Sequence, residues 1–215
     1  MTLVKACGIT RIEDAETACR LGYDAIGVIF AESPRRLDPE EARSIYRSVP
    51  PQVLRVGVFA NQEPGEVRGL MEYCGLDLVQ FHGEEDPGTV RSFGSRAIKA
   101  LRPRGRADLE MMEEYDGVFA VLLDGWNPTL RGGSGTRCDW GLAARAAGSK
   151  RIILAGGLDP CNVGEAIEKV APFGVDVSSG VELEPGIKDS LLLRDFLHEA
   201  RDAAARREEA RDGTE

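Results

Sequence analysis

The sequence predicts an α/β domain built on a parallel sheet, and three observations support this. Short runs rich in β-branched residues alternate with stretches of helical periodicity, which is the element order of a parallel α/β sheet. The runs are almost continuously apolar, as expected for strands that are covered on both faces. Eight such runs occur, and eight is the number of strands that closes a barrel.

Each predicted strand is a short apolar run that ends near a glycine or a polar residue. The strands are expected at 3–9, 25–30, 54–60, 78–83, 96–102, 117–124, 151–157 and 174–181. Helical spacing follows at 11–20, 39–48, 63–73, 139–147 and 162–170, and a last helix begins at about Ser190. A doubly wound open sheet is the alternative, but it usually has fewer strands and often carries a G-x-G-x-x-G turn after the first one. That turn does not occur here, so we predict a (β/α)8 TIM barrel.

The chain length fits one such barrel. Closed α/β barrels of about 200 to 250 residues fold as single domains, and this chain has 215 residues. Beyond Arg201 the last helix carries charge on all sides. A segment without an apolar face has little to pack against, so we expect a barrel domain over 1–205 and a disordered tail over 206–215.

Composition limits the classes of partner. The formal net charge is −9, which gives no general attraction to nucleic acid or to an anionic membrane surface. Small phosphorylated ligands, bound at a local site, remain open. No signal-peptide pattern and no run of about 18 apolar residues is present, so we expect a cytoplasmic protein. The five cysteines include no CxxC pair and are odd in number, which favours free thiols.

Glycine and serine gather after the last two predicted strands, in "AGGLDPCN" and "VDVSSGVE". Glycine lets backbone N–H groups approach phosphate oxygens, and a following helix start adds unpaired donors. The loops after strands 7 and 8 are the usual phosphate site of this fold. A single glycine pair would indicate only a tight turn, but two consecutive loops favour phosphate binding. The expected residues are Gly156, Gly157, Ser178, Ser179 and Gly180.

A candidate acid and a candidate base also end strands. Asp124 follows "AVLL", and partial desolvation at the barrel rim would favour its protonated form. Cys7 ends the first strand, and a thiol with an ordinary pKa of about 8.5 needs a nearby positive charge or amide dipole to form thiolate at neutral pH. Lys5 lies two residues earlier on the same strand face. Taken singly, a buried cysteine or a capping aspartate would be structural.

The segment "ESPRRLDPEEA" places two arginines after the second strand. Pro34 stiffens this loop, and a guanidinium there suits bidentate recognition of a carboxylate. A solvated basic pair at the start of the next helix is the alternative.

These segments together resemble a known family. The blocks "VKACGIT", "SPRRL", "VGVFAN", "VQFHGEE", "LLDGWNPTLRGGSGTRCDW", "AGGLDPCNV" and "VDVSSGVELEPGIKD" are similar to the signature blocks of phosphoribosylanthranilate isomerase, an enzyme of tryptophan biosynthesis. They occur in the family's order and cover the chain from residue 4 to about 189. The main departures are Ala6 in the first block and Trp126 directly after Asp124 and Gly125, where it would shape the site mouth or cover the substrate ring.

The resemblance implies an aldose–ketose isomerisation, the third step of tryptophan biosynthesis from chorismate. N-(5-phosphoribosyl)anthranilate becomes 1-(o-carboxyphenylamino)-1-deoxyribulose 5-phosphate by an Amadori rearrangement. By resemblance, Cys7 is the general base, Asp124 is the general acid and Arg35 meets the substrate carboxylate. A one-residue slip in the alignment would exchange Arg35 for Arg36.

The resemblance also assigns three pocket residues and implies no cofactor. Lys5, His82 and Asp176 are expected to line the pocket. The amine nitrogen of the substrate already serves as the electron sink, so a cofactor would have no task. His82 has no ligand cluster around it in the sequence, because the second histidine, His198, lies in the tail helix, and no metal is expected. A monomer and a homodimer both remain open.

Three other functions compete with this interpretation. By resemblance, the related sugar isomerase of histidine biosynthesis, or a dual-substrate version of it, would carry a pair of aspartates as acid and base. The first strand here offers Cys7 instead. Indole-3-glycerol-phosphate synthase calls for catalytic lysine and glutamate and an extra N-terminal segment. A catalytically silent barrel that binds a sugar phosphate would not need a thiol opposite a carboxylic acid.

Overall fold

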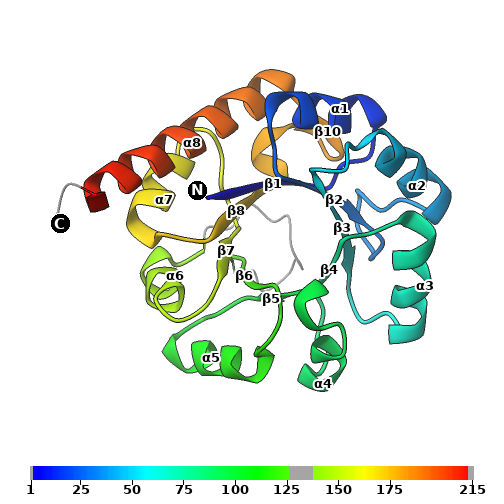
Figure 1. Ribbon diagram of the computed structural model, residues 1–215, viewed down its shortest axis with the longest axis horizontal. Helices are drawn as coiled ribbons and strands as arrows, with labels where there is room; N and C mark the ends of the chain where they lie inside the picture. Colours follow the sequence, from blue (N-terminus) through cyan, green and yellow to red (C-terminus); the bar gives the residue numbers. More distant parts are fainter. Residues whose placement is uncertain (1, 126–137, 213–215) are drawn as a thin grey trace.

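The computed structural model describes residues 2–125 and 138–212, and in them eight parallel strands close into one barrel (Figure 1). The barrel order follows the chain, with β1 hydrogen-bonded to both β2 and β8. The strands are β1 (Leu3–Cys7), β2 (Ala25–Ile29), β3 (Leu54–Phe59), β4 (Leu78–Phe81), β5 (Ala97–Leu101), β6 (Ala120–Leu123), β7 (Ile152–Leu154) and β8 (Gly174–Val177). The predicted fold class is confirmed.

Helices form a ring around the strands (Figure 1). They are α1 (Ile12–Leu21), α2 (Pro39–Ser48), α3 (Pro64–Cys74), α4 (Pro87–Arg91), α5 (Arg106–Glu110), α6 (Trp140–Ala147), α7 (Val163–Val170) and α8 (Ser190–Asp212). Short 3₁₀ turns are η1 (Gly94–Arg96), η2 (Met111–Tyr115) and η3 (Ser179–Val181). Sequence periodicity does not reveal α4 and α5, because five residues are too few to show a helical repeat.

Helix starts are encoded locally. Asp38 accepts a hydrogen bond from the Glu41 backbone, while the Glu41 side chain accepts from the Asp38 backbone, and proline follows at the first helical position of α2. This capping box satisfies two N–H groups that the helix itself leaves unpaired. Asp139 caps α6 in a similar way, through the backbone N–H groups of Gly141 and Leu142. These caps place each helix directly after its loop at the barrel mouth.

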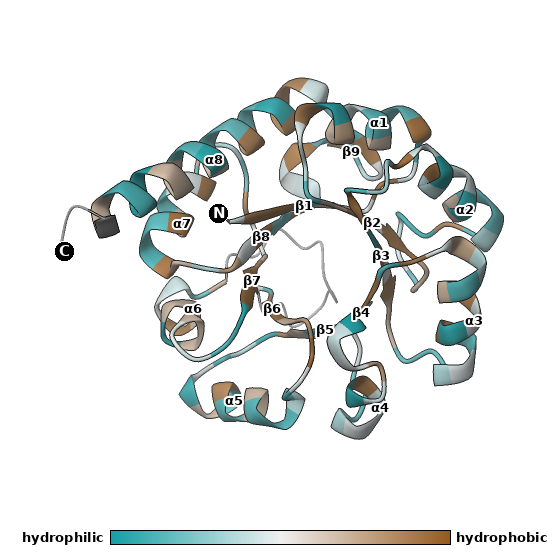
Figure 2. Ribbon diagram, in the orientation of Figure 1, coloured by the Kyte–Doolittle hydropathy of each residue, from teal (hydrophilic) through white to brown (hydrophobic). Residues whose placement is uncertain are grey.

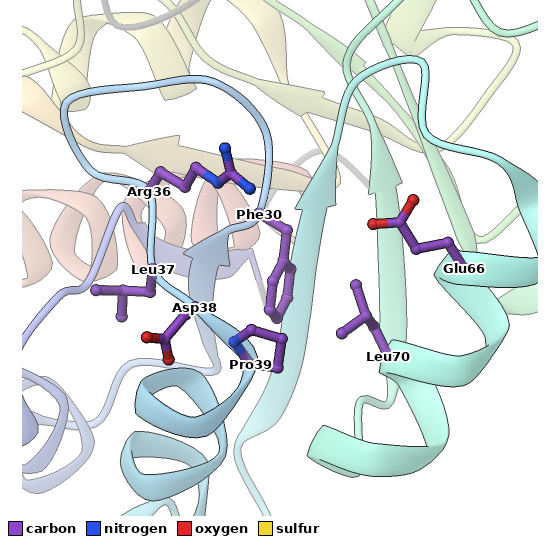
Figure 3. Close-up of a pocket in the computed structure, with 7 residues that line it drawn as sticks. All are labelled: Phe30, Arg36, Leu37, Asp38, Pro39, Glu66 and Leu70. Carbon is purple, nitrogen blue, oxygen red and sulfur yellow. The ribbon is translucent and has the colours of Figure 1, made fainter.

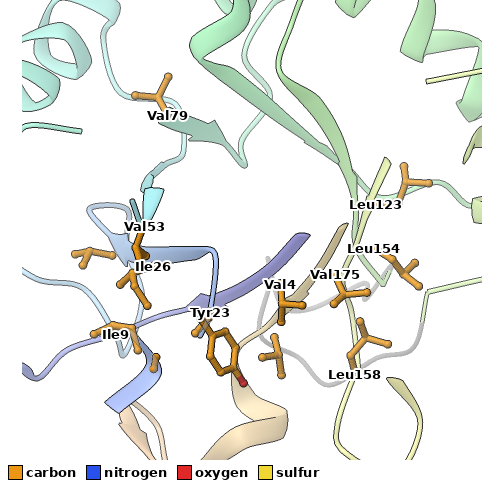
Figure 4. Close-up of a cluster of buried hydrophobic side chains, with 14 of the residues drawn as sticks. Val4, Ile9, Tyr23, Ile26, Val53, Val79, Leu123, Leu154, Leu158 and Val175 are labelled. Carbon is orange, nitrogen blue, oxygen red and sulfur yellow. The ribbon is translucent and has the colours of Figure 1, made fainter. Parts of the chain in front are cut away.

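The strands bury a different set of side chains on each face. One cluster alternates along the strands and fills the barrel interior, and it includes Val56, Leu78, Ile98, Leu122 and Ile153. The neighbouring strand positions pack outward against the helices, as Figure 4 shows for Val79, Leu123 and Leu154. Hydropathy colouring shows the strands as mostly hydrophobic and the helices as mixed (Figure 2). Strands buried on both sides explain the continuous apolar runs of the sequence.

A small antiparallel hairpin follows the barrel. Its strands are β9 (Glu182–Glu184) and β10 (Ile187–Lys188). The sequence pattern extends the eighth strand to Val181, but the structure ends β8 at Val177 and inserts the η3 turn before the hairpin. The hairpin lies next to β1 and α1 in Figure 1 and Figure 2.

Helix α8 continues across residues 206–212, where the charge pattern predicts disorder. Arg206 pairs with Glu168 of α7 at 2.9 Å, so part of the charged segment has a partner from another element. Closer to the barrel, Arg201 donates to the Thr2 carbonyl at 2.7 Å and pairs with Asp24 at 2.8 Å. No described helix combines the length and apolarity needed to cross a bilayer.

Candidate active site

The predicted site residues follow the inward-facing positions of the strands to one end of the barrel. Alternation along β1 brings Lys5 and Cys7 to the same face, and alternation along β4 does the same for Gln80 and His82. Asp124 continues the inward set of β6 after Leu122. All of these groups approach the carboxyl ends of the strands, where barrel enzymes place their sites.

Lys5 connects the thiol to a carboxylate. Its Nζ donates to Oδ1 of Asp176 at 2.9 Å, and the two residues are paired in register on β1 and β8. Both side chains are buried, at 1% and 8% exposure. Burial raises the pKa of Cys7, and the charge and hydrogen bond of Lys5 offset only part of that rise. Lys5 therefore lowers the pKa of Cys7, as expected. The net pKa is nevertheless raised, not lowered, because the effect of burial is larger than that of the Lys5 charge.

Because Gly27 of β2 has no side chain, there is space beside it for the side chains of Cys7 and Lys5. A Cβ at this position would lie 3.0 Å from the Cys7 Sγ and 3.2 Å from the Lys5 Nζ. The thiol and the ammonium thus flank the same point of the β2 backbone, with which Cys7 is paired in register. Any side chain at Gly27 would displace one of them.

Asp124 is held on both carboxylate oxygens. Oδ1 accepts the Gly125 backbone N–H at 2.8 Å, and Oδ2 lies 3.2 Å from Nε2 of His82. The other ring nitrogen of His82 lies 3.0 Å from Nε2 of Gln80. Asp176 lies within electrostatic reach of both Asp124 and His82, so this carboxylate group and the Lys5 group share one site.

The two glycine-rich loops pack directly on each other. Gly156 and Gly157 adopt φ of 82° and 64°, a region that favours glycine. A Cβ at Gly180 would overlap the carbonyl oxygen of Leu158, so the loop after β8 lies against the loop after β7 with no space between them. Asn162, at the start of α7, donates to the Gly157 carbonyl at 2.9 Å and fixes this loop. Ser178 and Ser179 continue from β8 into the η3 turn.

Arg35 reaches the same site from the loop after β2. A Cβ at Gly8 would lie 2.6 Å from the Arg35 Cδ and 2.9 Å from the Ser178 Oγ, so Arg35 passes directly over the residue that follows Cys7. Its guanidinium makes a bidentate pair with Glu182, through Nε at 2.8 Å and Nη2 at 2.6 Å. Arg35 is thus bound to a carboxylate of its own chain.

Arg36 points elsewhere. It lines a separate pocket of about 290 Å³ on the outside of the barrel, between the loop after β2 and helix α3. The pocket also includes Phe30, Leu37, Asp38, Pro39, Glu66 and Leu70 (Figure 3). Of the two arginines, only Arg35 lies beside Cys7 and Ser178.

Several residues of this site are not apparent from the sequence. Gly8 and Gly27 provide space for side chains from other strands, and Glu182 and Lys188 form ion pairs inside the site. Gly8, Glu182 and Lys188 lie within the quoted sequence blocks, but the blocks give them no role, because Gly8 meets Ser178 and Glu182 meets Arg35 only in the folded chain. Trp126 lies outside the described residues. All five cysteines are described and are unpaired, and the described residues include no cluster of histidine, cysteine and carboxylate groups suited to a metal ion.

Comparison with known proteins gives one consistent result. The family model described as N-(5'phosphoribosyl)anthranilate (PRA) isomerase matches residues 4–199. The N-(5'-phosphoribosyl)anthranilate isomerase of Citrifermentans bemidjiense is 50% identical over 95% of this chain and 99% of its own length, and that of Pelobacter propionicus is 48% identical over 94% and 97%.

Solved structures agree. The phosphoribosyl anthranilate isomerase of Thermotoga maritima superposes with a TM-score of 0.87 at 41% identity, covering 94% of this chain and all of that one (100%). A phosphoribosyl anthranilate isomerase in complex with reduced 1-(o-carboxyphenylamino)-1-deoxyribulose 5-phosphate superposes with a TM-score of 0.84 at 40% identity, with coverage of 94% and 100%. The family resemblance seen in the sequence blocks is confirmed, and this chain belongs to the N-(5'-phosphoribosyl)anthranilate isomerase family.

Proposed function

We propose that this protein converts N-(5'-phosphoribosyl)anthranilate to 1-(o-carboxyphenylamino)-1-deoxyribulose 5-phosphate, with Asp124 as general acid and Cys7 as general base. The observation that carries the assignment of roles is the arrangement of two separate groups at one barrel mouth. One is a buried thiol beside Lys5, and the other is a carboxyl group fixed by His82 and the Gly125 amide. A relative of known structure binds the reduced form of this product.

The first step opens the ribose ring. Asp124 gives its proton to the ring oxygen while the bond from C1 to that oxygen breaks, and the anthranilate nitrogen supplies the electron pair that forms the iminium. A proton donor is effective here only if it is held within hydrogen-bond reach of the oxygen. The two contacts that hold the Asp124 oxygens, one from Gly125 and one from His82, provide this orientation.

The second step removes the proton from C2. The Cys7 thiolate takes it, the electrons of the C–H bond neutralise the iminium, and an enolamine forms. The 2-hydroxyl proton then passes to Asp124 and the Cys7 thiol protonates C1, which gives the ketose and returns both groups to their starting states, so no net proton is consumed. Burial keeps the pKa of Cys7 raised, but the iminium makes the C2 proton acidic and brings a positive charge close to the sulfur. A small thiolate fraction beside Lys5 is then sufficient.

The substrate carries an anionic group at each end, and the site offers a receptor for each. We assign the phosphate to the Gly156–Gly157 loop and the adjoining residues Ser178 to Gly180, which bring backbone N–H groups and the start of α7 together. We assign the anthranilate carboxylate to Arg35. We place the reaction in the cytoplasm, and both a monomer and a homodimer are compatible with a site built from one chain.

Loss of substrate fluorescence on adding purified protein tests the reaction directly. The wild-type protein is expected to turn over N-(5'-phosphoribosyl)anthranilate. C7S and D124N are expected to abolish turnover while keeping affinity for the reduced product within about tenfold, because acid and base groups act mainly in the transition state. C19S changes a half-buried cysteine on α1, outside the assigned site, and serves as the matched control. Full turnover by both C7S and D124N would refute the assignment.

A further inference from the structure

The hairpin after β8 carries two buried charges into the site. Glu182 lies on β9 and Lys188 on β10, and their side chains are 4% and 0% exposed. Glu184, on the same hairpin, is exposed. Buried charges are costly unless they are paired and hydrogen-bonded, so the partners of Glu182 and Lys188 indicate what they do.

Glu182 accepts four hydrogen bonds, one from the Gly186 backbone at 3.3 Å and three from positively charged side chains. Two come from Nε and Nη2 of Arg35, at 2.8 Å and 2.6 Å, and one comes from Nζ of Lys188 at 2.7 Å. Lys188 also donates to the Ser178 carbonyl at 3.1 Å, which connects the hairpin to the end of β8. Burial tends to raise the pKa of Glu182, but Arg35 and Lys188 lower it further than burial raises it, so the residue is a carboxylate.

This pairing determines the direction of the Arg35 guanidinium. The group is planar, so fixing the edge formed by Nε and Nη2 also fixes the edge that carries Nη1. Nη1 makes no hydrogen bond to any described residue, and the stem of Arg35 crosses Gly8 beside Cys7. The free edge therefore remains for an acceptor at the barrel mouth.

The charges of this cluster are unequal. Arg35 and Lys188 contribute two positive charges and Glu182 contributes one negative charge, so one positive charge remains. A ligand carboxylate would balance it in a partly buried setting, where such pairs are stronger than in water. Resting on the proposed function, we propose that Glu182, held by Lys188, is a positioning residue that orients Arg35 for the substrate carboxylate and so determines specificity for an ortho-carboxylated aniline.

Two substrates separate this role from a general structural role. N-(5'-phosphoribosyl)anthranilate carries the carboxylate, and N-(5'-phosphoribosyl)aniline lacks it. E182Q is expected to lower kcat/KM for the first about tenfold to hundredfold, the usual cost of losing a hydrogen bond to a charged group, mainly through KM. The same change is expected to alter kcat/KM for the second by less than about twofold. E184Q alters a neighbouring exposed carboxylate and is expected to change neither value.

A double variant shows whether Glu182 acts through Arg35. In an R35A background, E182Q is expected to leave the ratio of the two kcat/KM values unchanged, because the guanidinium to be positioned is absent. E182D keeps the charge on a side chain that is one methylene shorter, and it is expected to give a ratio of kcat/KM values between those of wild type and E182Q. It replaces E182Q in the test if E182Q does not fold.

The proposal would be overturned if folded E182Q left the ratio of the two kcat/KM values unchanged, whether both values fell equally or neither fell. Failure of the wild-type protein to turn over either substrate would instead refute the proposed function.

Discussion

His82 Nε2 lies 3.2 Å from Asp124 Oδ2, and Gln80 Nε2 lies 3.0 Å from the other ring nitrogen of the same histidine. These two contacts hold the ring between Gln80 and Asp124, and the tautomer decides which ring nitrogen donates. The His82 carbonyl in turn accepts from Arg102 at 3.0 Å. His82 thus holds one oxygen of the proposed general acid at a fixed position.

Replacing His82 tests this positioning. H82Q is expected to lower kcat about tenfold or more with little change in KM, because a misplaced acid loses part of the factor of about 10² to 10⁴ that general acid catalysis provides. Steady-state kinetics give both parameters. H198Q is the control, since His198 is exposed on α8 and pairs with Asp202 at 3.2 Å. A wild-type kcat in H82Q would show that the His82 imidazole does not position Asp124 for catalysis.

Removing Lys5 is expected to raise the pKa of Cys7 further. Burial already raises this pKa, and Lys5 is the main group that lowers it. K5M alone would leave Asp176 as an unpaired buried charge, at a cost of about 3–5 kcal/mol, so K5M/D176N is the better variant. Lys5 lowers the thiol pKa more than Asp176 raises it, so the midpoint should still move to higher pH.

Alkylation of the Cys7 peptide, measured by mass spectrometry as a function of pH, reports this midpoint. A midpoint at or below the wild-type value in K5M/D176N would contradict the role of Lys5 in supporting the thiolate.

The contact between Gly180 and Leu158 predicts a local effect on phosphate binding. In G180A the new methyl group would overlap the Leu158 carbonyl, so the two loops must separate, at a cost of about 1–3 kcal/mol. Weaker binding of inorganic phosphate and a lower Tm are expected, by calorimetry and thermal unfolding. G69A, in helix α3, adds a methyl group with nothing within 4 Å and should stabilise by up to about 1 kcal/mol. Unchanged phosphate affinity in G180A would separate this contact from the anion site.

Glu85 is expected to make stability depend on acid pH. Burial tends to raise its pKa, but the hydrogen bond and charge of Lys99, at 2.7 Å, lower it below its ordinary value. A lowered carboxyl pKa contributes stability above the unfolded value of about 4.3, and this contribution is lost as the pH falls through the folded value. E85Q should therefore be less stable than wild type at pH 7, and the difference should shrink on acidification.

Urea unfolding at several pH values measures this difference. E84Q changes the adjacent exposed carboxylate and is the control. A gap between E85Q and wild type that is constant from neutral to acid pH would rule out the linkage.

The sequence by itself determines the barrel and the positions of its chemistry. Apolar runs at period two and helical spacing between them are local properties, and they identify each strand within a few residues. Because the carboxyl ends of parallel strands share one end of a barrel, the order of strands and helices is enough to assign Cys7, His82 and Asp124 to the same mouth. The same rule places the two glycine-rich loops side by side.

Only the tertiary structure decided how these groups are paired and charged. The Lys5–Asp176 bond joins residues 171 positions apart, and the Arg35–Glu182 bond joins residues 147 positions apart, so no local pattern contains either pair. The raised pKa of Cys7 follows from its burial, which depends on everything packed around it. Helix α8 is likewise helical beyond residue 205, where Arg206 meets Glu168 of another helix. Burial and long-range pairing set these properties, and both arise only when distant segments are brought into contact.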